Sequence, residues 1–229
     1  MSLVFGERLR AAFAPPRFIA LPLSGIDIST SSIKAVRLEE GPYGLVLAGF
    51  AKVRLPAGAF NDGDITDRAA VLETLLLASE AAGVSATNAA LPESKSYLFE
   101  TVVQGKTKAE WRVAVEQHLD ELVPLPPPET AFDLVPIGQG ERGDVPVVGV
   151  GFAERVMNDT LALFDDAHIH VHSLDGETFA MARALLPPGD TSTTLIIDVG
   201  KTTTKISIVT GRIPRFATTI GIGGHAFTL

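Results

Sequence analysis

The stretch GIDISTSSIKAV at residues 25–36 is an apolar segment ending in Asp27, then a turn of small hydroxyl residues, then a second apolar segment that carries Lys34. The stretch LIIDVGKTTTKISIV at residues 195–209 repeats this order around Asp198. Such turns direct backbone N–H groups and hydroxyls at phosphate oxygens, and an aspartate beside them is a hard oxygen ligand suited to Mg²⁺. Two copies predict two similar lobes that hold a nucleotide phosphate tail from opposite sides.

The composition is that of a globular α/β protein without disulfides. The chain has 229 residues, of which 46% are hydrophobic and 20% charged, enough for one large domain or two small ones. A net charge of −8 disfavours nonspecific binding to nucleic acid or acidic membranes. The absence of cysteine excludes disulfides and thiolate metal sites. Because no apolar run reaches the ~20 residues of a membrane span and no long signal core opens the chain, we expect a cytoplasmic protein.

The first part of the chain predicts a leader followed by a mixed α/β layer. Residues 1–22 mix apolar residues with arginines, and we expect a loosely docked leader in preference to a helix lying on a membrane surface. Residues 23–93 follow in β-β-β-α-β order. The predicted elements are three strands within residues 23–54 with a turn at 41–44, a helix over 67–82 and a strand over 88–91.

Residues 94–171 predict a separate inserted module in β-α-β-β-α-β order. Thr107 and Glu110 form a capping-box pattern that opens a helix, and Pro124 ends it. The predicted strands cover residues 97–103, 131–137, 145–152 and 169–171, and the predicted helices cover residues 107–122 and 154–166. Modules of this kind more often bind partners than catalyse reactions.

After the module, the chain returns to the first layer and then begins a second lobe. Residues 172–189 contain a predicted helix over 175–186, which two prolines end. Residues 190–229 contain the second aspartate hairpin and a further strand, and they finish in a glycine-rich segment. Gly223 and Gly224 would normally introduce a helix, which we expect to be absent here.

Together these features resemble the actin-like ATPase superfamily and, within it, the PilM family of type IV pilus assembly proteins, which is related to FtsA. The resemblance covers residues 18–229 and is carried by four stretches: GIDISTSSIK at 25–34, ALPE at 90–93, EQHLDELVPLP at 116–126 and LDGETFAMARAL at 174–185. It implies an actin-like, ribonuclease H-like fold. Residues 23–93 and 172–189 would form subdomain 1A, residues 94–171 the inserted βαββαβ subdomain 1C, and residues 190–229 the start of a truncated second lobe.

The resemblance implies a site for ATP and Mg²⁺ between the lobes. Asp27 and Asp198 would order the Mg²⁺ shell, and Glu177 would polarise the attacking water as the catalytic residue. Lys201 is either a phosphate ligand or an exposed turn lysine. The other residues implied in nucleotide binding are Ser29, Thr30, Ser31, Ser32 and Lys34 in the first hairpin, and Gly200, Thr202, Thr203, Gly223 and Gly224 in the second lobe.

Two departures from the family pattern bear on activity. Ser29 stands where the family usually has glycine, so its side chain is expected to crowd the phosphate or to strain the turn, because serine tolerates positive φ much less than glycine does. Members of the family also continue well beyond the equivalent of residue 229, with most of the second lobe and the loops that hold adenosine. We therefore expect little or no ATP hydrolysis by this chain.

The partner implied by the resemblance is the cytoplasmic tail of a PilN-like membrane protein, held in a groove between subdomains 1A and 1C. A tail that pairs with an α/β groove gains main-chain hydrogen bonds and side-chain pockets. The groove would draw on residues 91–101 and 122–132. The protein would then lie at the inner membrane, without spanning it, beside the pilus platform and motor proteins; homo-oligomerisation is left open.

Two other functions share this fold class. An FtsA-like cell-division protein would need an amphipathic membrane helix at its carboxyl end. A sugar or carboxylate kinase would need a catalytic aspartate in a glycine-rich turn, a context that Asp120, Asp133, Asp144 and Asp159 lack.

The motif His168-x-His170-x-His172 places three imidazoles on one face of a predicted strand. Imidazole suits Zn²⁺, but a site needs further convergent ligands. We therefore favour a solvated face over a metal site.

Overall fold

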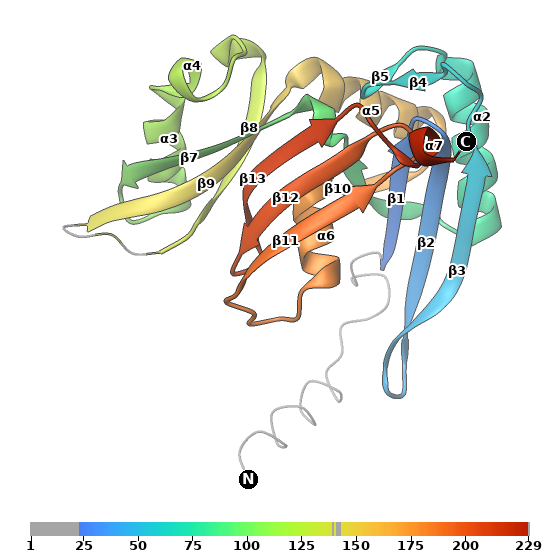
Figure 1. Ribbon diagram of the computed structural model, residues 1–229, viewed down its shortest axis with the longest axis horizontal. Coiled ribbons are helices and arrows are strands. Elements are labelled where there is room, and N and C mark those ends of the chain that lie inside the picture. The colour runs from blue at the N-terminus through green and yellow to red at the C-terminus, as the bar shows by residue number, and fades with distance from the viewer. Residues whose placement is uncertain (1–22, 139, 141–142, 229) are drawn as a thin grey trace.

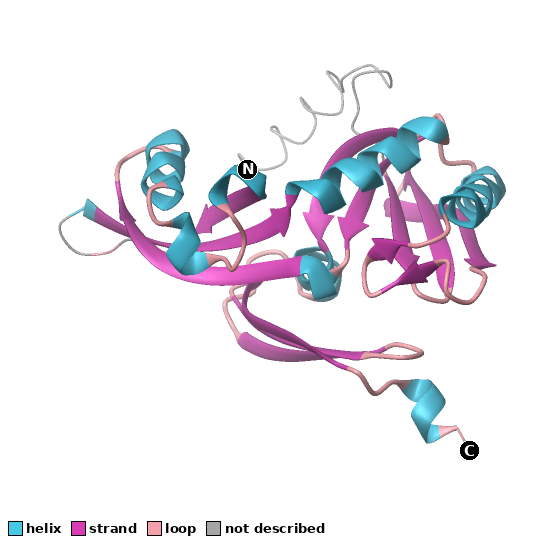
Figure 2. Ribbon diagram, turned by 90° about the horizontal axis from the view of Figure 1, so that it is seen from above, coloured by secondary structure: helices cyan, strands magenta, loops and turns pink. Residues whose placement is uncertain are grey.

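The computed structural model describes residues 23–138, 140 and 143–228 (Figure 1). The predicted leader at residues 1–22 lies outside them. Within the described residues the strands form one five-stranded sheet, two three-stranded sheets and a small two-stranded hairpin. Seen from above in Figure 2, the strands nearest the carboxyl end form a layer of their own below the rest of the molecule.

The five-stranded sheet has the strand order β10-β6-β1-β2-β3. The first three strands are joined antiparallel, as the turn chemistry predicts, whereas β6 pairs parallel with both β1 and β10. The parallel pairs place the carboxyl ends of β1, β6 and β10 along one edge, beside the first aspartate turn. The strands are β1 (Ser24–Ser29), β2 (Ser32–Gly41), β3 (Gly44–Arg54), β6 (Ala86–Leu91) and β10 (His170–Gly176).

Helix α2 (Arg68–Ala82) packs on this sheet and follows its sequence signals closely. The Asp67 carboxylate accepts a hydrogen bond from the Ala70 N–H, which satisfies one of the free donors of the first turn. Gly83 ends the helix in the left-handed conformation, at φ 67°. Val71, Leu75 and Ala78 are fully buried and share one core with the sheet and with helix α5 (Glu154–Asp166).

The inserted module has a three-stranded antiparallel sheet of order β7-β9-β8, with its own core. The helix predicted over residues 107–122 is interrupted, because His118 has a non-helical backbone (φ −131°, ψ 19°). The break brings Leu119 and Val123 into the core that Val115 already occupies. The module's elements are β7 (Ser96–Gln104), α3 (Lys108–Glu116), α4 (Leu119–Leu122), β8 (Thr130–Pro136) and β9 (Asp144–Ala153), with 3₁₀ turns η1 (Glu93–Lys95) and η2 (Pro127–Glu129).

The strand predicted at residues 169–171 does not belong to the module's sheet. It is the start of β10, which extends to Gly176 and pairs with β6 in the five-stranded sheet. Consistently, Leu163 and Phe164 of α5 lie in the core of that sheet. Asp175, predicted in the next helix, is therefore a strand residue, and α6 (Glu177–Leu185) begins two residues later. The subdomain boundaries stay predictions.

The second lobe is the three-stranded sheet β11-β12-β13. It packs on α6 through Ile196 and Val209, which enclose Ala182. The strands are β11 (Thr193–Val199), β12 (Thr204–Thr210) and β13 (Ile213–Ile220). The helix expected to be absent after Gly223 is present as the four-residue α7 (Gly224–Phe227). Sequence reasoning also missed the hairpin of β4 (Phe60–Asn61) and β5 (Asp64–Ile65).

Candidate functional site

The two aspartate hairpins have the same cross-strand register. Asp27 of β1 lies opposite Lys34 of β2, and Asp198 of β11 lies opposite Lys205 of β12. Side chains opposite each other in an antiparallel pair share a face of the sheet. Each hairpin therefore presents one carboxylate and one ammonium group next to a hydroxyl-rich turn.

A cavity of about 450 Å³ lies between these hairpins. It brings together all the predicted site residues except Gly223 and Gly224. The β4–β5 hairpin borders one side of the cavity, and Pro92 with the start of η1 borders another. The lining comprises residues 27–32, Lys34, Lys52, residues 60–63, residues 92–94, Glu177, residues 198–203, Lys205 and Thr219.

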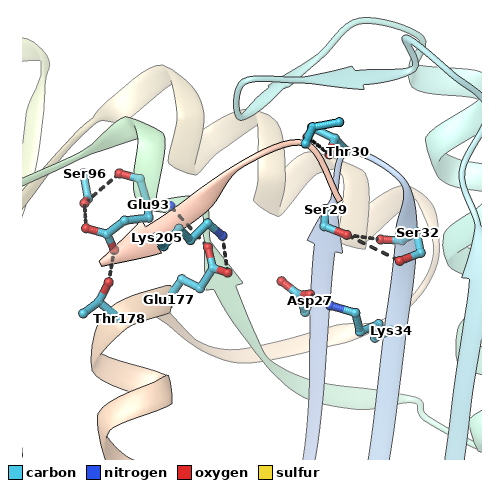
Figure 3. Close-up of polar contacts among 11 residues, drawn as sticks. Asp27, Ser29, Thr30, Ser32, Lys34, Glu93, Ser96, Glu177, Thr178 and Lys205 are labelled. Atoms are coloured by element: carbon cyan, nitrogen blue, oxygen red, sulfur yellow. Dashed lines mark hydrogen bonds and ion pairs between the residues drawn. The ribbon is translucent and has the colours of Figure 1, made fainter. Parts of the chain in front are cut away.

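The first turn is a tight connection through Thr30 and Ser31. The Ser29 hydroxyl donates to the carbonyl oxygen of Ser32 at 2.8 Å, which ties the two ends of the turn together (Figure 3). Among the described non-glycine residues, only Asp62, His168 and Arg212 have positive φ. The expectation of a strained turn at Ser29 is therefore wrong. Ser29 does not have a positive φ, so its backbone conformation does not require glycine.

The second turn is held from behind by the glycine-rich segment. The Gly200 N–H donates to the Thr203 carbonyl at 2.9 Å, and the Gly224 N–H donates to the Gly200 carbonyl at 2.8 Å. A Cβ at Gly223 would lie 2.6 Å from the backbone of Lys201, so only glycine fits this approach. Gly223 and Gly224 thus support the turn instead of lining the cavity. Across the cavity mouth, the Thr30 and Thr202 hydroxyls lie 3.3 Å apart.

Lys34 is the cation of the first hairpin. Its ammonium nitrogen lies 2.8 Å from an oxygen of Asp27. Burial lowers the pKa of Lys34, but the hydrogen bond and charge of Asp27, with the charges of Glu177 and Asp198, outweigh burial and raise it. Lys34 therefore stays protonated and interacts electrostatically with carboxylates from both lobes.

Glu177, the first residue of α6, is bound through both carboxylate oxygens. One oxygen accepts from the Lys205 ammonium and the other accepts from the Glu93 N–H at 3.4 Å (Figure 3). Burial raises the pKa of Glu177 although Lys205 acts in the opposite direction. In this arrangement both oxygens are occupied, so Glu177 holds its neighbours in place, and its role as the water-polarising group stays a prediction.

Sequence reasoning missed several residues that the fold brings to this site. The carboxylate of Glu93 is buried and accepts from the Thr178 hydroxyl and, at 2.8 Å, from the Ser96 hydroxyl. Lys52 reaches the cavity from β3, opposite Lys34. Lys205 did carry a sequence signal, since it follows Asp198 by seven residues as Lys34 follows Asp27.

The donor set fits a cation only together with a phosphate ligand. Asp27 and Asp198 both line the cavity, but the described residues contain no group of three or more His, Asp or Glu side chains that could hold a metal alone. Mg²⁺ is commonly bound by one or two carboxylates plus substrate phosphates and water. Two aspartates beside two phosphate-type turns match that pattern.

The histidines at residues 168–172 do not follow the alternation of a regular strand. His168 lies in the turn before β10 with φ 54°, and a bulge between Val171 and Ser173 breaks the alternation. His168, His170 and His172 are all exposed. The three side chains therefore belong to a solvated surface.

A second hollow of about 330 Å³ separates the inserted module from the five-stranded sheet. In the described part of the chain β8 pairs only with β9, so the other edge of β8 is free beside this hollow. Of the two stretches predicted to form the groove, only Leu91, Ala131 and Phe132 line it. Its other walls are residues 133–135, Val148, Val150, Phe152, Met157, residues 174–176, Phe179 and Arg183.

The rest of the predicted groove lies elsewhere. Ser96, Tyr97 and Leu98 of β7, with Leu122 and Pro124, border a hollow of about 470 Å³ against β13. Arg215 of β13 donates to Glu100 of β7 at 3.0 Å beside it. The second lobe therefore contacts this edge of the module, and β8 is the edge left accessible.

The first turn of α6 is the wall between the cavity and the β8 hollow. Gly176 and Phe179 line the hollow, and Glu177 between them lines the cavity. Among the described residues no helix is both long enough and apolar enough to cross a membrane.

Comparison with known structures places this fold among actin-like proteins. The PilM–PilN type IV pilus biogenesis complex matches with a TM-score of 0.79 and 22% identity, covering 93% of this chain and 64% of that one. The cytoplasmic domain of EpsL, from the type II secretion system of Vibrio cholerae, matches with a TM-score of 0.53 and 14% identity, covering 86% and 70%. EutJ of Carboxydothermus hydrogenoformans gives 0.50 and 12%, covering 91% and 55%.

Sequence comparison gives the family. Curated protein sequences gave no match. The family model for the type IV pilus assembly protein PilM, in contrast, matches residues 25–229, which is nearly the whole chain. With the actin-like fold and the two aspartate hairpins in place, this chain belongs to the PilM family of type IV pilus assembly proteins.

Proposed function

We propose that this chain binds the cytoplasmic tail of a PilN-like membrane protein in the β8 hollow. The protein would act on the cytoplasmic side of the inner membrane, in the platform that assembles the pilus. The observation that carries the proposal is the free edge of β8 beside an apolar hollow. An extended peptide can add to such an edge through main-chain hydrogen bonds while alternate side chains enter the hollow.

The lining of the hollow suits a partly apolar tail. Met157, Phe179, Leu174 and Phe152 contribute apolar side chains to it. Asp133, Asp175 and Arg183 add charge at the border, where Arg183 is paired with Asp175. A flexible methionine side chain adapts to a bound peptide, aromatic side chains offer it rigid contact area, and the charged groups would set its register.

We further propose that the cavity between the hairpins binds ATP with Mg²⁺. Asp27 and Asp198 would order the metal, and the turns at residues 29–32 and 200–203 would contact the phosphates. Bound there, Mg²⁺ would neutralise phosphate charge. Little hydrolysis is expected, because both oxygens of Glu177 are already hydrogen-bonded.

The test is a calorimetric titration with a synthetic peptide that corresponds to the PilN-like tail. We expect binding in the micromolar range. Replacing Phe179 with Ala should weaken it by about 2 kcal/mol, or roughly thirtyfold in Kd, because an aromatic wall of the pocket is lost. Val102→Ala is the matched control, since Val102 is 61% exposed on β7 of the same module and lies outside the hollow.

Absence of heat, together with absence of competition against a labelled peptide, would overturn the proposal. If the peptide binds the Phe179→Ala variant as tightly as the unchanged protein, the partner binds elsewhere on the surface.

A further inference from the structure

Lys205 has the same position in its hairpin as Lys34 has in the first. Each lysine follows its aspartate by seven residues and lies directly opposite it across the strand pair. Both lysine side chains line the cavity. One comes from the five-stranded sheet and the other from the second lobe, so the cavity has an ammonium group on each wall.

The two lysines differ in the carboxylate that holds them. Lys34 is paired with Asp27 of its own hairpin, whereas Lys205 is paired with Glu177 of α6 and not with Asp198. The Glu177–Lys205 pair is the more enclosed, with side chains 16% and 23% exposed. Because Lys205 is paired with Glu177 and not with Asp198, Asp198 has no ion pair among the described residues.

Glu177 is itself fixed before any ligand arrives. Its second oxygen accepts from the Glu93 N–H, and Glu93 is buried and bonded to Thr178 and Ser96. An ammonium group has three N–H donors, and Glu177 uses one. Lys205 is therefore held at the cavity wall with donor capacity to spare.

From this geometry we propose that Lys205 is a phosphate-binding residue, the second-lobe counterpart of Lys34, and that Glu177 positions it. The cavity then selects a chain of two or more phosphates, which can contact an ammonium group on each wall. This inference rests on the proposed nucleotide binding and adds the residue that sets its preference for phosphate chain length. A single phosphate has fewer oxygens to share between the two walls than a phosphate chain has, so its binding is expected to depend less on Lys205.

A purely structural ion pair is the alternative, in which Lys205 only fastens β12 to α6. The two roles differ in what Lys205→Met does to ligands. A structural role predicts a loss of thermal stability and equal losses for all ligands. A phosphate-binding role predicts a loss that grows with the number of phosphates and an affinity that depends less on salt, because one cation has been removed.

The experiment measures binding of inorganic tripolyphosphate, inorganic phosphate and MgATP by calorimetry. In Lys205→Met we expect affinity for tripolyphosphate and MgATP to fall about tenfold to a hundredfold, since a charge-assisted hydrogen bond is lost. Affinity for inorganic phosphate should change little, and Lys205→Arg should retain most of the binding. Lys108→Met is the matched control, because it removes a lysine from an exposed ion pair outside the cavity.

A second variant covers the case in which Lys205→Met fails to fold with Glu177 left buried and unpaired. Glu177→Gln combined with Lys205→Met removes both charges and should show the same chain-length-dependent loss. Unchanged tripolyphosphate and MgATP binding in either variant would overturn the role of Lys205 while leaving nucleotide binding intact. If the unchanged protein binds neither ligand, the nucleotide proposal fails as well, which is a different result.

Discussion

Glu177 is the residue at which the charges of the cavity meet. It is paired with Lys205, bonded to the backbone of Glu93 and close enough to Asp27 for their charges to repel. Burial is the largest influence and raises its pKa above the ordinary value of 4.5. The folded protein therefore holds this proton to higher pH than the unfolded chain does.

This difference predicts how stability depends on pH. As pH rises from below 4.5 through the raised pKa, the folded state binds more protons at Glu177 than the unfolded state, so this residue makes the protein progressively less stable. In the Glu177→Gln variant, residue 177 cannot titrate. Lys205, left without its partner, stays protonated over this pH range and so changes the variant's stability by a constant amount. The stability of the unchanged protein minus that of the variant, from urea melts, should fall as pH rises. A constant or rising difference would contradict the direction of the shift.

Single residues also show where sequence reasoning stopped. Asp27, Lys34 and the turn hydroxyls were identified because their pattern is local and repeated. The pairing of Lys205 with Glu177 depends on α6 packing against the second lobe, and no local spacing encodes it. The hydrogen bonds of Glu93 could not be predicted for the same reason. Ser96 is near Glu93 in sequence, but Thr178 is distant and reaches it only through the packing of α6.

Among the elements, α2 and β3 approach each other closely at Gly49. A Cβ there would lie 2.1 Å from the carbonyl oxygen of Ala82, in the last turn of α2. The same oxygen accepts a hydrogen bond from Arg37 of β2 at 3.2 Å. The helix end and two strands are thus fastened at one point, which leaves no room for a side chain.

Gly49→Ala should therefore destabilise the protein by about 1–3 kcal/mol, the usual cost of overpacking a filled site. The midpoint of urea unfolding, followed by circular dichroism, measures this. Gly221→Ala is the control, because a Cβ at Gly221 meets no atom within 4 Å. Equal midpoints for the two variants would mean that α2 can shift at no cost.

Elements with signals at both ends were predicted well, and elements whose partners are distant were not. Helix α2 has Asp67 before it and Gly83 after it. Helix α5 has no capping side chain, and its apolar spacing alone indicated where it begins and ends. The residues of β10 read as a strand but do not reveal their partner, so β10 was assigned to the wrong sheet. The break at His118 has no glycine or proline to announce it, because burial of Leu119 and Val123 determines it.

Across the whole molecule the core is unevenly distributed. The cluster under the five-stranded sheet contains seventeen buried residues, whereas the cluster joining the second lobe to α6 contains only Ala182, Ile196 and Val209. The opposite face of that second sheet exposes large apolar side chains, among them Leu195, Ile197 and Phe216. The second lobe is therefore the less stabilised part of the described chain.

We expect this imbalance to appear in hydrogen exchange. Amides of β11, β12 and β13 should exchange roughly tenfold or more faster than those of β1, β2 and β6, because a region with few buried contacts opens locally at lower cost. Mass spectrometry of peptides from the two sheets makes the comparison in one sample. Equal protection would show that the sheets unfold together.

The wall that α6 forms between the two hollows decides how mutant phenotypes can be interpreted. Gly176 and Phe179 line the partner groove and Glu177 between them lines the proposed nucleotide cavity, so a substitution that shifts this turn can disturb both. A piliation defect in such a strain then assigns no function to either. Separation-of-function alleles must come from the outer walls. Changes at Thr202 or Lys52 report on the cavity alone, and changes at Val135 or Met157 report on the groove alone.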